Sequence, residues 1–126
     1  MHREINQSFF RSGIELANLA ELTLKGQVYE SILSNSKVAM RLATEEECLF
    51  GRWYYGEGNE ALKGSREFRL IERPHEQVHQ SGTAAIEAFV QGRLNDTLSE
   101  LAQMEDCNVE VMRIVKRVLI EHDKGL

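Results

Sequence analysis

The chain contains few of the residues that build disulfide scaffolds and histidine-rich metal centres. Its 126 residues include two cysteines, four histidines and one proline. Two cysteines cannot form a disulfide framework or a four-cysteine zinc finger, and four histidines are too few for a histidine-rich di-iron bundle. Because nothing in the sequence indicates secretion, we expect a cytoplasmic protein with reduced cysteines.

The sequence also lacks long apolar runs and an excess of basic residues. No run of about 18 apolar residues occurs, and the first residues lack the apolar core of a signal peptide, so we expect no membrane insertion. The net charge of −5 argues against a nucleic-acid partner, since nucleic-acid-binding proteins usually present a basic face. The length suits one domain, which we place over residues 1–126.

Apolar residues recur at helical spacing, and the scarcity of proline and of β-type alternation predicts an all-α fold. We expect a first helix over residues 5–33 and a break at 34–36. The apolar stripe of this helix comprises Phe10, Ile14, Ala17, Leu24, Val28 and Ile32. Glu21 interrupts the stripe, so a carboxylate lies on an inward face, where it needs a partner.

The middle of the chain predicts two further helical segments. A short helix is expected over residues 37–42. Thr44 and Glu47 then form a T-x-x-E capping box, so a new helix should begin there and end near Gly56. Cys48 falls in the first turns of that helix, where the helix dipole favours a thiolate and the neighbouring glutamates oppose it.

Two long helices follow. Pro74 fits the first turn of one, which should run to its C-terminal cap at Gly92. Asn95 or Asp96 should cap the last helix, which continues to His122. The inward face of this last helix is expected to carry Leu98, Leu101, Met104, Val111, Val115 and Val118. The pattern predicts an antiparallel four-helix bundle with an additional short helix.

Two histidines lie on the apolar stripe of the helix that follows Pro74. His75 and His79 are four residues apart and face the same way as Ile86 and Phe89, so both imidazoles can bind one metal ion. The alternative is a pair of half-buried histidines that are satisfied by hydrogen bonds. The spacing alone does not decide between the two.

Cys48 and Glu21 also allow two interpretations. Cys48 precedes a run of aromatic residues, and a free cysteine in such a place is commonly a small core residue. Glu21 could reach solvent or pair with Lys25 one turn further on. Taken together, however, a thiolate, a carboxylate and two imidazoles form a plausible tetrahedral zinc site, and the ligand charge of about −2 would cancel the charge of the ion.

The sequence resembles the chemoreceptor zinc-binding domain (CZB) family, which consists of bacterial cytoplasmic domains attached to chemoreceptors or diguanylate cyclases. The C-x-[LF]-G-x-W-Y segment of the family appears at residues 48–54, and its P-H-x-x-V-H segment appears at 74–79. Its K-x-x-V-Y segment appears at 25–29. The resemblance extends over residues 9–120.

The resemblance implies a set of zinc ligands and one departure from it. The family binds zinc through one cysteine and three histidines, and Cys48, His75 and His79 match three of these positions. The position of the remaining family histidine is Glu21 in this chain. Glu21 could replace it as the fourth ligand, water could fill the position, or metal binding could be lost. We favour Glu21, because it lies on the inward face.

The resemblance also implies a function. It indicates a non-enzymatic sensory domain that responds to zinc or to an oxidant such as hypochlorous acid, forms a homodimer and signals to a chemoreceptor or diguanylate cyclase partner. One alternative is a metal-free helical interaction module. Another is a zinc hydrolase with water in the fourth position, although no additional acid, base or pocket signature favours it.

Overall fold

The computed structural model describes residues 2–35, 37–56 and 64–124, and the side chains of residues 12–120 within these ranges. The described residues contain no strand, which confirms the all-α prediction. The helices are α1 (His2–Leu33), α2 (Leu49–Tyr54), α4 (Arg66–Arg69), α5 (Glu72–Val90) and α6 (Leu94–Lys124). Within the described part of the chain, no helix is both long and apolar enough to cross a membrane.

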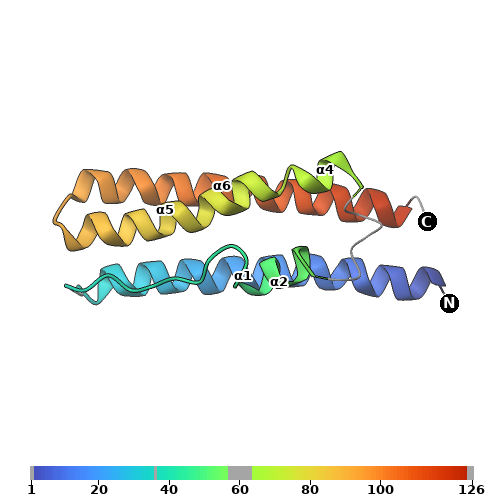
Figure 1. The fold of residues 1–126 in the computed structure, drawn as a ribbon, viewed down its shortest axis with the longest axis horizontal. Helices are drawn as coiled ribbons and strands as arrows, with labels where there is room; N and C mark the ends of the chain where they lie inside the picture. Colours follow the sequence, from blue (N-terminus) through green and yellow to red (C-terminus); the bar gives the residue numbers. More distant parts are fainter. Residues whose placement is uncertain (1, 36, 57–63, 125–126) are drawn as a thin grey trace.

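Three long helices lie side by side and form the body of the molecule (Figure 1). α5 packs more extensively against α6 than any other two helices pack together. The two are antiparallel and are joined by a turn in which Gly92 has a φ of 76°, a left-handed conformation that favours glycine. Gly92 therefore ends α5 as the sequence predicted.

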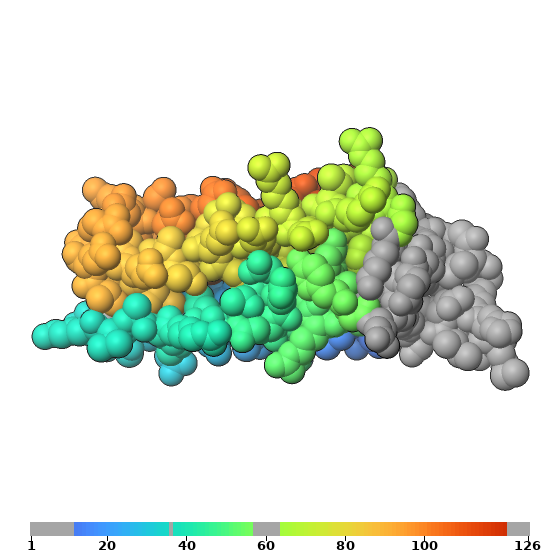
Figure 2. All heavy atoms as spheres, viewed as in Figure 1, coloured from blue at the N-terminus to red at the C-terminus, as the bar shows by residue number. Residues whose placement is uncertain are grey.

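The fourth pass along the bundle is made by residues 37–56, which run back beside α1 (Figure 1). Only α2 is helical in this returning segment. In the space-filling view the returning segment, coloured teal to green, lies beside α5 and in front of much of the coloured part of α1 (Figure 2). The described residues thus form three long helices and a largely non-helical fourth pass where the sequence predicted a bundle of four helices.

The prediction of a short helix over residues 37–42 was wrong. These residues form bends and extended chain, and Leu42 is the one buried side chain among them. With a single buried residue, the segment has no apolar face to pack as a helix. An extended chain also advances about 3.3 Å per residue, whereas a helix advances about 1.5 Å. An extended segment therefore needs fewer residues than a helix to run the same length along α1.

The capping box at Thr44 forms, but no helix follows it directly. Glu47 N donates to Thr44 Oγ1 at 3.3 Å, and Thr44 N donates to Glu47 Oε1 at 2.9 Å. The chain then makes a turn over residues 45–47, and α2 begins at Leu49. Cys48, with φ −69° and ψ 163°, is the N-cap of α2 rather than a residue of its first turns.

The last helix begins earlier than predicted. Thr97 N donates to Arg93 O at 2.9 Å, so Asn95 and Asp96 lie inside the first turn of α6 and do not cap it. Asp96 still forms an ion pair with Arg93 at 2.6 Å. Leu98, which the sequence placed on the inward face, is 65% exposed, because the inward stripe of α6 begins at the buried Thr97.

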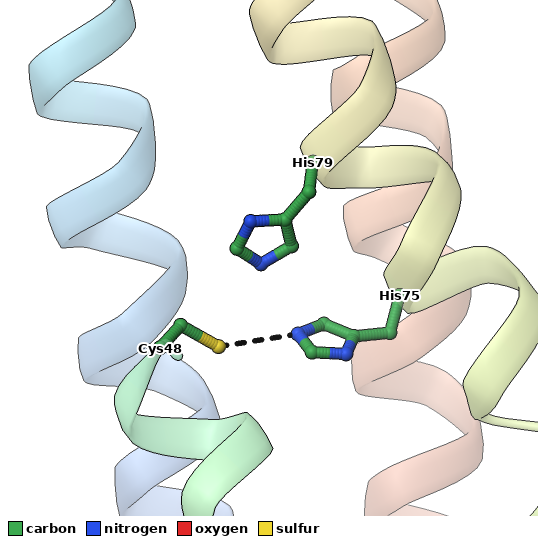
Figure 3. A group of neighbouring side chains, drawn as sticks. All are labelled: Cys48, His75 and His79. Atoms are coloured by element: carbon green, nitrogen blue, oxygen red, sulfur yellow. Dashed lines mark hydrogen bonds between the residues drawn. The ribbon is translucent and has the colours of Figure 1, made fainter. Parts of the chain in front are cut away.

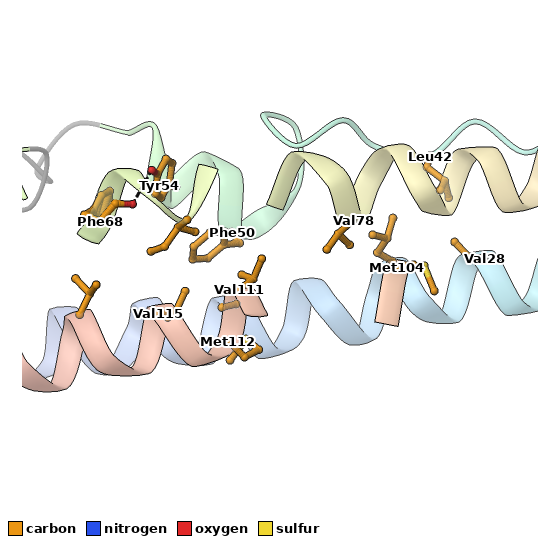
Figure 4. Packing of buried hydrophobic residues seen from close by; sticks show 14 of the residues in the cluster. Val28, Leu42, Phe50, Tyr54, Phe68, Val78, Met104, Val111, Met112 and Val115 are labelled. Carbon is orange, nitrogen blue, oxygen red and sulfur yellow. Dashed lines mark hydrogen bonds between the residues drawn. The ribbon is translucent and has the colours of Figure 1, made fainter. Parts of the chain in front are cut away.

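The other predicted stripes meet in one apolar core between the three long helices and α2 (Figure 4). Its predicted and buried members are Ala17, Leu24, Val28, Ile86, Met104, Val111, Val115 and Val118. Ile14, Ile32, Phe89 and Leu101 are partly buried, and Phe10 lies outside the described side chains. Polar residues on the inward faces of these helices therefore project into a shared interior.

Candidate metal centre

Cys48, His75 and His79 lie together between α2 and α5 (Figure 3). One ligand atom from each residue lies within 4.8 Å of the other two. The two histidines are buried and the cysteine is partly buried. The imidazole planes are nearly perpendicular, at 87°, with ring centroids 4.9 Å apart. Cys48 thus meets two histidines that lie at least 27 positions further along the sequence.

The N-terminus of α2 holds the sulfur of Cys48 in place. Gly51 N donates to Cys48 Sγ at 3.2 Å, and Sγ lies 3.7 Å from Glu45 O. A Cβ at position 51 would collide with that Glu45 carbonyl, so the close packing of the turn against α2 requires glycine. Burial raises the pKa of the Cys48 thiol, while the amide groups of Gly51 and Phe50 act in the opposite direction.

His75 contacts both Cys48 and Phe50. Its Nε2 lies 3.3 Å from Cys48 Sγ, and the rings of Phe50 and His75 meet edge to face at 5.1 Å. Burial, with a smaller contribution from His79, lowers the pKa of His75 to about 3. The imidazole is therefore neutral at neutral pH and keeps a lone pair.

A backbone carbonyl fixes the tautomer of His79. Its Nδ1 lies 2.7 Å from Ala43 O, and because a carbonyl can only accept, Nδ1 carries the proton. Nε2 is then left with the lone pair on the side of Cys48 and His75 (Figure 3). Burial lowers the pKa of His79, so this imidazole is also neutral. A histidine that donates to a carbonyl with one nitrogen and binds with the other is the usual arrangement of a metal ligand.

These residues fit a zinc ion. Zinc prefers sulfur and imidazole nitrogen, and both imidazoles here are held in the neutral form that binds a metal. The amide donor at Gly51 is suited to stabilise the thiolate that zinc requires. With three donors gathered, a tetrahedral site needs one further ligand.

Glu21, the candidate for that ligand, lies beside the cluster. It lines a cavity together with His75 and His79, and about 20 Å³ of this cavity is open to a water molecule. The alternative partner, Lys25, forms its ion pair with Glu105 instead, at 2.8 Å. The structure thus places Glu21 next to the site, on the inward side of α1, and its ligation stays a prediction.

One polar residue of this region was missed in the sequence. Asn108 on α6 is 5% exposed, and it lines the same cavity as Glu21 and both histidines. The sequence does indicate this residue, because Asn108 occupies the inward-facing position between Met104 and Val111 in the apolar stripe of α6. Asn108 thus interrupts the apolar stripe of α6, as Glu21 interrupts the apolar stripe of α1.

The second cysteine lies outside the cluster. Cys107 is partly buried on α6 and packs at the edge of the core. Burial raises the pKa of its thiol, and Gln103 Nε2 lies 3.6 Å from its sulfur. It therefore provides a matched control for Cys48.

The sequence model of the chemoreceptor zinc-binding domain family, CZB, matches residues 22–86, slightly more than half of the chain. The chain belongs to this family. The matched region contains Cys48, His75 and His79, whereas Glu21 and all of α6 lie outside it, so the match is shorter than the resemblance expected over residues 9–120. No curated protein and no solved structure matches the chain. CZB is a family of zinc-binding domains of chemoreceptors, and the cluster of Cys48, His75 and His79 is a possible metal site within the matched region.

Proposed function

We propose that this CZB domain is a cytoplasmic sensory domain of bacterial signal transduction that holds one zinc ion with Cys48, His75, His79 and Glu21. The observation that carries the proposal is the convergence of three donor atoms within 4.8 Å of one another. The family assignment supports zinc as the ion. The neutral state of both imidazoles supports ligation at physiological pH.

Charge balance supports Glu21 as the fourth ligand. A thiolate and a carboxylate together neutralise the +2 charge of zinc, and a neutral cluster avoids the free-energy cost of burying net charge. Glu21 lines the same cavity as His75 and His79. Lys25, one turn further along α1, forms its ion pair with Glu105 at 2.8 Å.

We infer that the input is either zinc itself or an oxidant that attacks the sulfur of Cys48. With hypochlorous acid, the thiolate sulfur forms a bond to oxygen, the O–Cl bond breaks and chloride leaves, so that sulfur is oxidised to sulfenic acid and chlorine is reduced. Cys48 is the most exposed member of the cluster, and a hollow of about 40 Å³ between α1 and Leu49 adjoins it. Oxidation would weaken the bond from sulfur to metal and disturb the N-cap of α2.

The output is proposed to pass to a chemoreceptor or diguanylate cyclase partner from a homodimer of this domain, with no catalysis by the domain itself. The family supports a regulatory role. Leu19 and Leu22, one turn apart on α1, are 49% and 67% exposed and offer an apolar surface for a second copy. Light scattering of the purified protein tests the dimer: a mass of one chain at all concentrations would contradict it.

Elemental analysis tests the metal. We expect about one zinc ion per chain, with strong loss in Cys48→Ser and in His75→Ala and no change in Cys107→Ser. Circular dichroism of each variant separates loss of the site from loss of the fold. A parent protein that holds no zinc after zinc is supplied would overturn the proposal and favour the metal-free interaction module.

Sulfenic acid trapping tests the oxidant. The zinc-loaded protein is treated with hypochlorous acid below one equivalent, the sulfenic acid is trapped with a dimedone reagent and the modified cysteine is located by mass spectrometry. Cys48 should be modified well before Cys107. Equal modification of both cysteines would contradict a zinc-thiolate switch and leave zinc concentration as the input.

A further inference from the structure

A buried amide on α6 lacks the hydrogen-bond acceptor that its burial demands. Asn108 is 5% exposed, and its Nδ2 has no hydrogen-bond partner among the residues that the structure describes. A buried donor without an acceptor destabilises a folded protein, because it loses its bonds to water and gains none in return. An acceptor for Asn108 should therefore exist in the loaded protein.

The surroundings of Asn108 limit what this acceptor can be. Most of the residues that line its cavity are apolar, and Figure 4 labels four of them where α2, α5 and α6 meet, namely Phe50, Val78, Val111 and Met112. The polar residues of the lining besides Asn108 are Glu21, His75 and His79. About 20 Å³ is open to water, which is room for a single molecule.

An oxygen atom is the acceptor that this cavity can provide. His79 uses Nδ1 on Ala43 and directs Nε2 to the cluster. His75 directs Nε2 to Cys48, and its Nδ1, which is also buried without a partner among the described residues, carries the proton when Nε2 binds a metal and so cannot accept. The carboxylate of Glu21 and one water molecule remain. Both are also the candidates for the fourth ligand of a zinc ion held by Cys48, His75 and His79.

We propose that Asn108 is a positioning residue of the metal centre, whose Nδ2 donates a hydrogen bond to the oxygen that completes the coordination of zinc. The inference rests on the proposed function of the site. Through Asn108, α6 would contribute to the site beside α1, α2 and α5. Because an amide is neutral, it orients this oxygen without adding charge to the site.

The first test compares Asn108→Leu with Thr97→Val. Leucine has the same branched shape as asparagine but cannot donate. Thr97 is a buried polar residue of the same face of α6, three turns away, whose hydroxyl donates to Arg93 O. Zinc affinity, measured by competition with a chelator, should fall about 10- to 100-fold in Asn108→Leu and stay unchanged in Thr97→Val. Equal zinc affinities in the parent and in Asn108→Leu would overturn the proposal.

Two readouts separate positioning from a general structural role. The metal-free Asn108→Leu protein should melt at the same or a higher temperature than the metal-free parent, because the variant no longer buries an unsatisfied amide. The visible spectrum of the cobalt-substituted protein should shift, since the oxygen ligand is no longer oriented. A lower melting temperature without metal, together with an unchanged cobalt spectrum, would identify Asn108 as structural only. Asn108→Ala, which cannot overfill the cavity, serves if the leucine variant does not fold.

A double variant distinguishes the two sources of the oxygen. If the acceptor is the Glu21 carboxylate, Asn108→Leu should cause no further loss of zinc affinity in a Glu21→Leu background. If the acceptor is water, Asn108→Leu should keep its full effect in that background. A parent protein that binds no zinc would contradict the proposed function, whereas a parent that binds zinc no more tightly than Asn108→Leu would contradict the role of Asn108 alone.

Discussion

His79 Nδ1 donates to the backbone carbonyl of Ala43 across a distance of 2.7 Å. This bond ties a candidate metal ligand on α5 to the non-helical returning segment that leads to Cys48. The candidate metal centre is therefore connected to the least regular part of the bundle by a direct hydrogen bond. A change at His79 would therefore be passed to the loop that precedes Cys48, part of which is exposed.

The bond from His79 to Ala43 should order the returning segment independently of the metal. His79→Ala should increase amide hydrogen exchange over residues 43–51 by about five- to tenfold, since one buried hydrogen bond contributes about 1 kcal/mol. His79→Asn should preserve the protection, because its Nδ2 can occupy the place of Nδ1, yet it should not restore zinc binding. Equal exchange in the parent and in His79→Ala would show that packing alone orders the segment.

Gly51 should be required for the N-cap that holds Cys48. A methyl group at this position collides with Glu45 O, which is backbone and cannot rotate away. Gly51→Ala should therefore lower the free energy of unfolding by about 1–3 kcal/mol in urea titration, and should weaken zinc binding by displacing the sulfur. Gly26→Ala is the matched control: nothing lies within 4 Å of its added Cβ, and alanine should stabilise α1 by up to about 1 kcal/mol. Similar unfolding curves for both variants would contradict this account.

The stability of the protein should fall at alkaline pH, in part because of Tyr54. Its hydroxyl donates to Phe68 O at 2.8 Å, and burial raises its pKa to about 12. A raised pKa means that the folded state holds the proton more tightly, so this stabilisation is complete below pH 10 and is lost as the pH rises from about 10 to 12. Urea titrations at pH 8 and pH 11 should show a smaller decrease in Tyr54→Phe than in the parent. An identical decrease would assign the effect to other tyrosines.

Glu21 should matter for the metal and not for the fold. Removing one of four ligands should weaken zinc binding by more than the 10- to 100-fold that loss of a supporting hydrogen bond typically costs. Chelator competition on Glu21→Ala measures this, and Glu30→Ala, an exposed glutamate of the same helix, is the control. Full zinc occupancy and unchanged affinity in Glu21→Ala would show that Glu21 is not the fourth ligand.

Short-range physics made much of the architecture predictable. The three long helices and the end of α5 at Gly92 follow from helical spacing and local backbone preference, both of which act within a few residues. Local rules also predicted the hydrogen bonds of the capping box at Thr44. Local rules failed over residues 37–42, because the conformation of this segment depends on how it packs along α1. They also failed at Leu98, because its burial depends on which face of α6 packs against α5.

The candidate ligands were readable from the sequence because each interrupts an apolar stripe or follows a family motif. His75 and His79 share a face by spacing alone, and the tertiary structure brings Cys48 to them. Sequence could not show that Ala43 sets the tautomer of His79 or that Asn108 enters the same cavity, since both relationships join segments more than 25 residues apart. Periodicity determines which residues face inward, and the packing of distant segments decides which of them meet.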